Sequence, residues 1–311
     1  MKLYVGVTDS EWFDYLSSLP EIDEVNFWQP SGDSTFKALN PGEMFLFKLH
    51  SPRDYIVGGG IFAYATNLPI SLVWDAFKEK NGASSYEEMR GRIIRYRRNA
   101  DSLWEDFKVG CILLTQPFFL NKSDWFKVPE WSSPIVRGKR YYLNSEAGKL
   151  IWRKIVNVLS GKEELYLNNA KKGFIEEHDR YGNEMLIKPR LGQGAFKILV
   201  TDAYNRSCAI TREKALPVLE AAHIRPYSQE GPHEVKNGIL FRSDMHKLFD
   251  KGYMTVTPKL HIEVSRRIKE EFENGKYYYN FHGEQVHLPQ RLEDNPSSEF
   301  LTWHNENIFH K

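Results

Sequence analysis

A segment of about fifty residues in the last third of the chain constrains the fold more than any other feature of the sequence. The run VLEAAHI at residues 218–224 is typical of a β-strand and contains His223. After a polar loop, Asn237 precedes a second short apolar run, GILF, at residues 238–241. Residues 243–250, SDMHKLFD, follow with helical spacing. The segment therefore predicts a small ββα unit with polar side chains at fixed positions.

The expected helix of this unit carries His246 and Asp250, which are four residues apart and so share one helical face. Ser243 or Asp244 can cap the start of the helix, and Gly252 suits its end. A strand packed against such a helix would bring its own histidine close to this face.

These residue types match the needs of phosphodiester hydrolysis, which takes a base to deprotonate water and a divalent cation to neutralise charge. His223 can supply the base, while His246 and Asp250 can hold the cation. Asn237 can bond across the loop and orient the imidazole. For each residue alone, a packing or surface role is the commoner reading. We interpret His233 as a loop residue, with a place near the phosphate path as the alternative.

The segment resembles the HNH nucleases of the ββα-metal superfamily, in the subgroup written AHI…NG…HxLFDxG. The resemblance implies that His223 is the general base, that Asn237 orders the loop and that His246 binds metal, with Asp250 as a second ligand. It implies a Mg²⁺-class ion, with Mn²⁺ or Ni²⁺ as alternatives. Many members carry a metal ligand where this chain has Ala222. Many also have two CxxC pairs, whereas only Cys208 remains here, so we predict no structural zinc.

The chain of 311 residues is long enough for two domains. We expect an α+β protein with a recognition domain at residues 1–140, a basic helical linker at 141–175 and the nuclease domain at 176–311. The linker contains an amphipathic helix over residues 143–160, with Leu150 and Ile151 in its apolar stripe. No apolar run approaches the length of a membrane span, and the N-terminus lacks a signal peptide pattern, so we expect a cytoplasmic protein.

The first 140 residues combine strand-like runs, such as EMFLFKL and YIVGGGIFAYA, with helices over residues 72–81 and from Ser84 to Arg98. Their strand rhythm resembles the PUA-like superfamily, which includes the EVE, ASCH and SRA readers of modified bases. The resemblance implies a β-barrel with helices and a pocket for a flipped base. The aromatic residues expected to line that pocket, each with core packing as the alternative, are Trp28, Phe62, Tyr64 and Trp74.

The formal net charge is +1, but the charge is unevenly distributed along the chain. Residues 137–215 hold 16 basic and 9 acidic residues, and a cluster of arginines lies between Arg90 and Arg98. These stretches are either solvated surfaces or contacts to phosphates. The residues expected to contact DNA phosphates are Arg95, Arg97, Arg98, Arg137, Lys139, Arg140, Lys171 and Lys172.

A PUA-like reader joined to an HNH nuclease resembles modification-dependent, type IV-like restriction enzymes. This resemblance implies double-stranded DNA with 5-methyl- or 5-hydroxymethylcytosine as substrate, recognition by base flipping, and defence against phage DNA. A homodimer would let two nuclease units cut both strands. Two alternatives stay open: a nuclease whose first domain senses a nucleotide signal or RNA, and a non-catalytic DNA-binding module. Towards the C-terminus, residues 276–288 are expected to form a strand.

Overall fold

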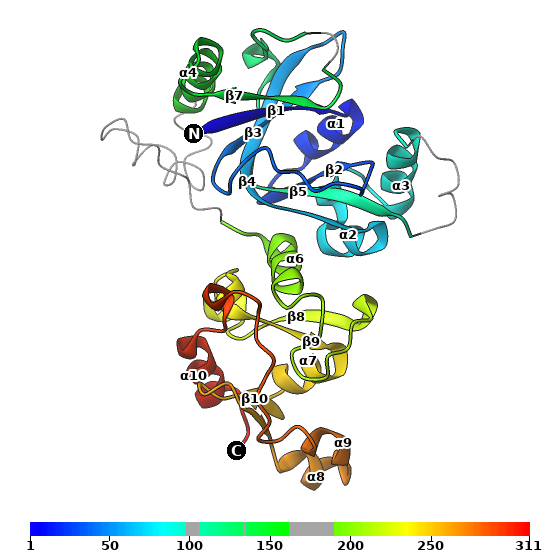
Figure 1. Ribbon diagram of the computed structural model, residues 1–311, viewed down its shortest axis with the longest axis vertical. Coiled ribbons are helices and arrows are strands. Elements are labelled where there is room, and N and C mark those ends of the chain that lie inside the picture. The colour runs from blue at the N-terminus through cyan, green and yellow to red at the C-terminus, as the bar shows by residue number, and fades with distance from the viewer. Residues whose placement is uncertain (98–105, 133–134, 162–189) are drawn as a thin grey trace. The chain divides into compact units, whose positions relative to one another are not determined.

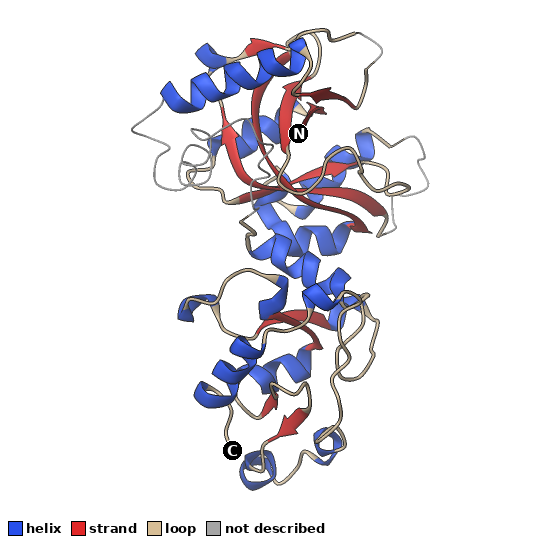
Figure 2. Ribbon diagram, turned by 60° about the vertical axis from the view of Figure 1, so that its left-hand side comes forward, coloured by secondary structure: helices blue, strands red, loops and turns tan. Residues whose placement is uncertain are grey.

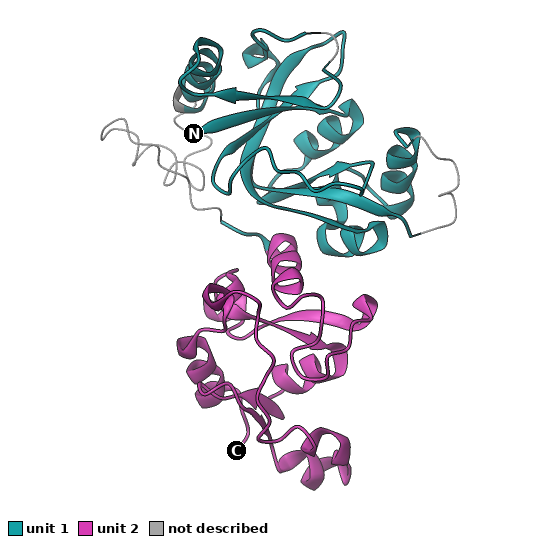
Figure 3. Cartoon of the chain, in the orientation of Figure 1, with its two compact units in different colours: residues 1–192 teal, residues 193–311 magenta. Residues whose placement is uncertain are grey.

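The computed structural model describes residues 1–97, 106–132, 135–161 and 190–311. The chain divides into two compact units, Met1–Gly192 and Gln193–Lys311 (Figure 3). Both units combine helices with strands, which confirms the α+β class (Figure 2). None of the helices in the described ranges combines the length and apolar character needed to cross a membrane.

The first unit is built on a mixed sheet with the strand order β2-β5-β4-β3-β1-β7, and β6 pairs with β4 (Figure 1). The strands pair antiparallel except β1 and β3, which are parallel. Among the described strands β2 and β7 are not paired, so closure into the expected barrel is absent from these pairings. The strands are β1 (Lys2–Thr8), β2 (Glu24–Gln29), β3 (Met44–Leu49), β4 (Tyr55–Pro69), β5 (Lys108–Phe119), β6 (Phe126–Lys127) and β7 (Gly138–Tyr142).

The glycine run in β4 lets neighbouring strands approach closely. A Cβ atom on Gly58 would lie 2.3 Å from the carbonyl oxygen of Phe118, and one on Gly59 would lie 2.6 Å from that of Phe45. The register of β4 against β5 also shifts between Gly59 and Ile61. Side chains are therefore excluded here by the sheet itself, so the run is explained by strand packing.

The helices expected over residues 72–81 and from Ser84 onward are present, and the helix after Asp9 was not expected. Asp9 caps α1, and Ser85 accepts a hydrogen bond from the Glu88 backbone at the start of α3. The latter helix ends at Arg95 rather than at Arg98. The helices and 3-10 turns are α1 (Ser10–Ser18), α2 (Ile70–Phe77), η1 (Lys78–Asn81), α3 (Tyr86–Arg95), η3 (Lys122–Asp124) and α4 (Glu146–Gly161).

The amphipathic helix α4 packs on the sheet of the first unit. Ile151 and Ile155 are fully buried in the same cluster as Leu3 and Val5 of β1. Leu150, which the sequence places in the apolar stripe, is instead 41% exposed. The helix thus adds to the core of this unit through its apolar face.

The second unit contains the expected ββα motif. Strands β8 and β9 pair antiparallel, with His223 opposite Gly238, and α7 follows directly. Its helices and strands are α6 (Gln193–Ala203), β8 (Leu219–His223), β9 (Gly238–Arg242), α7 (Ser243–Asp250), β10 (Met254–Val256), β11 (Ile262–Val264), α8 (Arg267–Phe272), α9 (Lys276–Tyr279) and α10 (Ser298–Asn307). Its 3-10 turns are η4 (Leu216–Val218), η5 (Tyr227–Gln229), η6 (Val235–Asn237) and η7 (Leu292–Asp294).

The ends of α7 differ in part from expectation. Arg242 occupies the cap position without a side-chain cap bond, and Asp244 pairs with that arginine instead, so the capping prediction was wrong. Gly252 follows the helix with φ +72°, as its predicted role requires. Residues 276–279 are helical rather than extended, because Gly275 at φ +99° begins a turn and the Tyr279 hydroxyl bonds to the Ser265 carbonyl.

The core of the second unit positions the polar residues of the motif. Ala222 and Ile239, a cross-strand pair, are fully buried with Phe249 of α7. Helix α6 lies against the start of β9, where a Cβ on Gly238 would lie 2.4 Å from a methyl of Val200. Helices α6 and α7 both contact β8 and β9. His223, at the end of β8, lies opposite Gly238, at the start of β9.

Candidate active site

His223 is the last residue of β8 in the second unit. Its ring stacks on Phe196 of α6, with a centroid distance of 3.8 Å and an interplanar angle of 11°. Burial, and to a lesser degree the neighbouring His233 and His246, lower the pKa of His223 to about 4, and Asp250 opposes them. The imidazole is therefore neutral at pH 7 and retains a lone pair that can accept a proton.

His246 of α7 lies between two carboxylates. Its Nδ1 is 2.6 Å from Oε2 of Glu220, and its Nε2 is 3.2 Å from Oδ2 of Asp250. Burial lowers the pKa of His246, but its hydrogen bonds to Asp250 and Glu220 outweigh burial, so the pKa is raised overall. Glu220 was missed from the sequence, where its only signal is a carboxylate inside an otherwise apolar strand.

The donors around His246 fit a divalent cation in type. Mg²⁺ commonly takes one or two carboxylates and completes its shell with water. The imidazole of His246 and the carboxylate of Asp250 are close enough to reach one ion. Among the described residues, no group of three or more His, Cys, Asp or Glu side chains is arranged so that it could hold a metal ion. Ala222 has no ligating side chain and is buried in the core.

Asn237 is fully buried and ties together the loop between β8 and β9. Its amide oxygen accepts a hydrogen bond from the Arg225 backbone at 2.9 Å. Its amide nitrogen donates to the carbonyl oxygens of Arg225 and Pro232, each at 2.9 Å. All three bonds go to backbone, so Asn237 fixes the path of the chain directly after His223.

His233 lies inside this loop and its Nδ1 is 3.0 Å from Nε2 of His223. Its ring stacks on Tyr227 at 4.6 Å. His233 is a loop residue, as interpreted from the sequence, and its ring lies against His223. The sequence holds no periodic signal for this contact, because the loop at residues 224–237 can close in many ways.

Cys208 is fully buried near the other end of the β8–β9 strand pair. Its sulfur accepts hydrogen bonds from the backbone amides of Ile210 and Thr211 at 3.5 Å and of Arg242 at 3.3 Å. The thiol thus joins the turn that leads to β8 to the end of β9.

A cavity of about 610 Å³ opens in the first unit. Trp28 lines it, while Phe62, Tyr64 and Trp74 are not among the lining residues. Phe62 is only 4% exposed and packs edge-on against Phe36. The side chains that give the cavity its chemical character are Asp9, Asp33, His50, Tyr96, Arg97 and Arg137.

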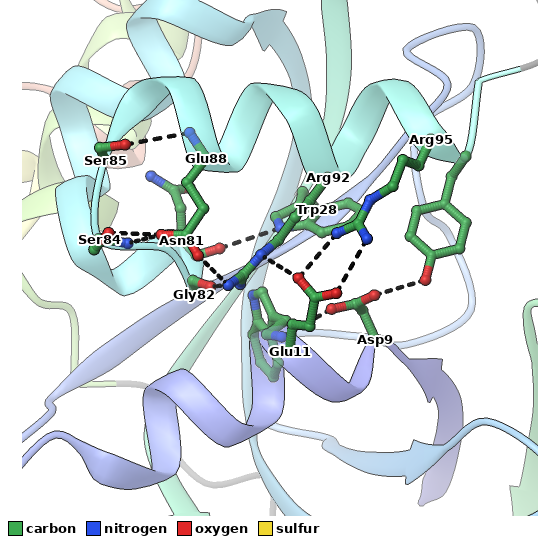
Figure 4. Close-up of polar contacts among 12 residues, drawn as sticks. Asp9, Glu11, Trp28, Asn81, Gly82, Ser84, Ser85, Glu88, Arg92 and Arg95 are labelled. Carbon is green, nitrogen blue, oxygen red and sulfur yellow. Dashed lines mark hydrogen bonds and ion pairs between the residues drawn. The ribbon is translucent and has the colours of Figure 1, made fainter.

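The arginines of α3 are largely engaged within the protein. Arg92 is buried against Glu88 and Glu11, and Arg95 forms a bidentate pair with Glu11 (Figure 4). Arg97 donates to the Lys108 carbonyl at 3.1 Å and faces the cavity.

The predicted phosphate contacts on β7 and beside it are more open. Arg137 and Arg140 are exposed, and Arg137 also lines the cavity. Lys139 donates to the Glu130 carbonyl at 2.7 Å. Arg98, Lys171 and Lys172 lie outside the described residues.

Comparison with protein families matches residues 208–257 to the family described as HNH endonuclease. No curated protein matches the chain. The chain is similar to the crystal structure of ASCH from Zymomonas mobilis, with 12% identity, a TM-score of 0.32, and coverage of 50% of this chain and 94% of that chain. It is also similar to the modification-dependent restriction endonuclease TagI, with 11% identity, a TM-score of 0.27, and coverage of 98% and 81%.

The matched segment contains the positions of the ββα motif, which are His223, Asn237, His246 and Asp250. His223 lies at a strand end, Asn237 holds the following loop, and His246 faces Asp250 on one helix. The second unit therefore carries an HNH endonuclease domain.

Proposed function

We propose that this endonuclease is a metal-dependent restriction enzyme that cuts double-stranded DNA carrying a modified cytosine. In this proposal the nuclease unit hydrolyses the phosphodiester and the first unit selects the DNA by holding a flipped base. The observation that carries the selective part is the cavity of the first unit, with its combination of aromatic rings, carboxylates and guanidinium groups.

Hydrolysis follows from the chemistry of the nuclease unit. The neutral imidazole of His223 takes a proton from water, whose oxygen bonds to phosphorus as the bond from phosphorus to the 3′ oxygen breaks. A divalent cation held by His246 and Asp250 would neutralise charge on the phosphate and on the departing oxygen. Asn237 keeps the loop after His223 in place through its three backbone bonds.

The cavity suits a nucleobase in size and in chemistry. Its volume falls within the roughly 300–1,000 Å³ of small-molecule sites. Tyr96 stacks on His50 with an interplanar angle of 6°, and Trp28 is 6.1 Å from Tyr96, so flat rings border the space. Asp9 and Asp33 can accept hydrogen bonds from an exocyclic amino group such as that of cytosine. Arg137 can pair with a phosphate of the flipped nucleotide.

The test is cleavage of duplexes of one sequence that carry cytosine, 5-methylcytosine, 5-hydroxymethylcytosine or N6-methyladenine, in Mg²⁺, Mn²⁺ or Ni²⁺. We expect cutting of a cytosine-modified duplex at least tenfold faster than of the plain one. Equal cutting of all duplexes would refute selection by modified cytosine. Cutting that requires an added nucleotide or RNA would support a different sensor, and no cutting with any metal would refute the enzyme.

A pair of tyrosine variants tests the cavity itself. Tyr96→Ala removes a ring that borders it, and Tyr142→Ala removes an equally exposed tyrosine of β7 that does not line it. Stacking contributes about 1–3 kcal/mol per base, so Tyr96→Ala should raise the Kd for the modified duplex by about 5- to 150-fold. Tyr142→Ala should leave this Kd within twofold. Equal effects of the two variants would place recognition elsewhere.

Two broader parts of the proposal have their own measurements. A role in defence predicts that cells carrying the protein resist phage whose DNA contains modified cytosine, and that His223→Ala cells do not. Each chain has one ββα site, so cutting of both strands predicts that two copies of the protein bind each duplex. Light scattering of the DNA complex with a His223→Ala variant measures that number.

A further inference from the structure

We propose that His233 is a positioning residue of the nuclease, which accepts a hydrogen bond from Nε2 of His223 and so makes Nδ1 of His223 the atom that takes the proton from water. This inference rests on the proposed function, because it assumes that His223 is the general base. It adds an atom-level assignment and a residue outside the HNH motif.

The assignment follows from counting protons on the two rings. Nε2 of His223 and Nδ1 of His233 are 3.0 Å apart, so one hydrogen lies between them. If His233 donated this hydrogen, the lone pair of Nε2 would be used and Nδ1 of His223 would carry its other hydrogen. No lone pair would then remain for water. If His223 donates, its Nδ1 keeps an available lone pair, and the hydrogen bond stays intact throughout the reaction.

Three neighbours hold His233 in this arrangement. Tyr227 covers one face of its ring in parallel stacking, with an interplanar angle of 6°. Asn237 donates a hydrogen bond to the carbonyl oxygen of Pro232, the residue that precedes His233. Gly231 allows the tight turn, because a Cβ there would lie 1.8 Å from the Arg225 carbonyl oxygen. The loop that Asn237 orders therefore delivers His233 to His223.

On the other side, Phe196 stacks on the His223 ring at 3.8 Å. This contact and the bond at Nε2 leave the ring little freedom to rotate or flip. The arrangement is comparable in its logic to a carboxylate that fixes the tautomer of a catalytic histidine, with a neutral imidazole as the acceptor. A neutral acceptor still stabilises the imidazolium that forms when His223 gains the proton.

The first test reads the tautomer without any cleavage. Nitrogen-15 NMR of histidine-labelled full-length protein should show His223 protonated at Nε2 and unprotonated at Nδ1. His233→Phe keeps a ring against Tyr227 but removes the acceptor, and should give a mixture of the two tautomers. His233→Asn returns an acceptor at the δ position and should restore the single tautomer. A wild-type His223 protonated at Nδ1 would overturn the proposal.

The second test is the kinetic split between the same variants on a cleaved duplex. Because His233 acts through His223, His233→Phe should lower kcat about 10- to 100-fold with KM within twofold, as for other residues that orient a catalytic imidazole. His233→Asn should recover most of kcat, and His261→Phe, at an exposed histidine of the same unit, should leave it unchanged.

The results separate this inference from the proposed function. Equal kcat in His233→Phe and wild type, or equal loss in His233→Phe and His233→Asn, would overturn it. If the wild type cuts no DNA, the proposed function fails while the NMR result still decides the tautomer. If His233→Phe does not fold, the wild-type tautomer and His233→Asn decide.

Discussion

Acidification should destabilise the nuclease unit through a histidine that has no part in the chemistry. His304 of α10 is 2% exposed and stacks on Phe249 at 3.7 Å. Its Nδ1 is 2.8 Å from the Thr255 hydroxyl and its Nε2 is 3.1 Å from the Phe249 carbonyl. Burial lowers the pKa of His304 to about 4, although the bond to Phe249 and the charge of Asp250 oppose the shift.

The sign and size of the effect follow from linkage. Because the folded-state pKa lies below the unfolded value of 6.5, the unfolded state binds more protons between pH 6.5 and pH 4, and stability falls as the pH falls through this range. The shift lowers the free energy of unfolding by about 3 kcal/mol at a pH where His304 is protonated in both the folded and the unfolded state, and by about 2 kcal/mol at pH 5. Above pH 7.5 the contribution is fully present.

The assay compares wild type with His304→Gln, which cannot titrate. Trp303 is the only tryptophan of residues 193–311, so the fluorine NMR signal of 5-fluorotryptophan at this position follows urea unfolding of the second unit. We expect His304→Gln to be about 1–3 kcal/mol less stable at pH 7.5, because it loses the ring stacking and hydrogen bonds. Between pH 7.5 and pH 5 it should lose about 2 kcal/mol less than wild type does.

The comparison isolates His304 because the lowered pKa of His223 affects both proteins alike. The reasoning is refuted if the two proteins lose the same stability between pH 7.5 and pH 5. It is also refuted if proton NMR finds that His304 titrates near pH 6.5 in the folded protein.

Three further predictions concern the site and the fold. Asn237→Ala leaves three backbone groups of the loop without their hydrogen-bond partner and should destabilise the second unit by about 2–4 kcal/mol. Asn237→Asp should destabilise it more, because its carboxylate would face two carbonyl oxygens. Chemical denaturation measures both variants, and an Asn237→Asp variant as stable as wild type would contradict the bonding pattern. His223→Ala should lower the cleavage rate by about 10²- to 10⁴-fold while leaving DNA affinity within twofold. Loss of DNA binding by this variant would argue against a catalytic role. EDTA should stop cleavage by the wild type until Mg²⁺ is restored. Gly82→Ala should destabilise the first unit by more than about 2 kcal/mol, because Gly82 has φ +79° and a Cβ there would lie 2.1 Å from Trp12. Gly91→Ala in α3, where a Cβ would meet open space, should instead raise the free energy of unfolding by about 0.5–1 kcal/mol. Thermal unfolding that ranks the two glycine variants the other way would refute this account.

Local patterns carried most of what could be predicted about the nuclease unit. The strand run to His223, the strand after Asn237 and the i,i+4 pair of His246 and Asp250 all rest on periodicities of a few residues, and β8, β9 and α7 follow them. Such periodicities depend on backbone geometry alone. They therefore locate the motif without knowledge of the rest of the chain.

Contacts between distant segments lie beyond such patterns. The arginines of α3 were expected to form a solvated surface or to contact phosphates, and the sequence gives no sign that Arg92 and Arg95 pair with Glu11, which lies more than eighty positions earlier. Likewise Trp28 borders the cavity with Tyr96 of a distant segment, whereas Phe62, equally aromatic in the sequence, is in the core. Residue type indicates what a side chain can do, and packing selects which partner it has.

The sequence by itself therefore determined the order of β8, β9 and α7 and the residues of the HNH motif, because both depend on spacing along the chain. Only the tertiary structure decided that Glu220 faces His246 and that His233 meets His223. Those two contacts depend on how a helix packs on a strand and how Asn237 closes a loop, and each is set by the free energy of the whole unit rather than by neighbours in sequence.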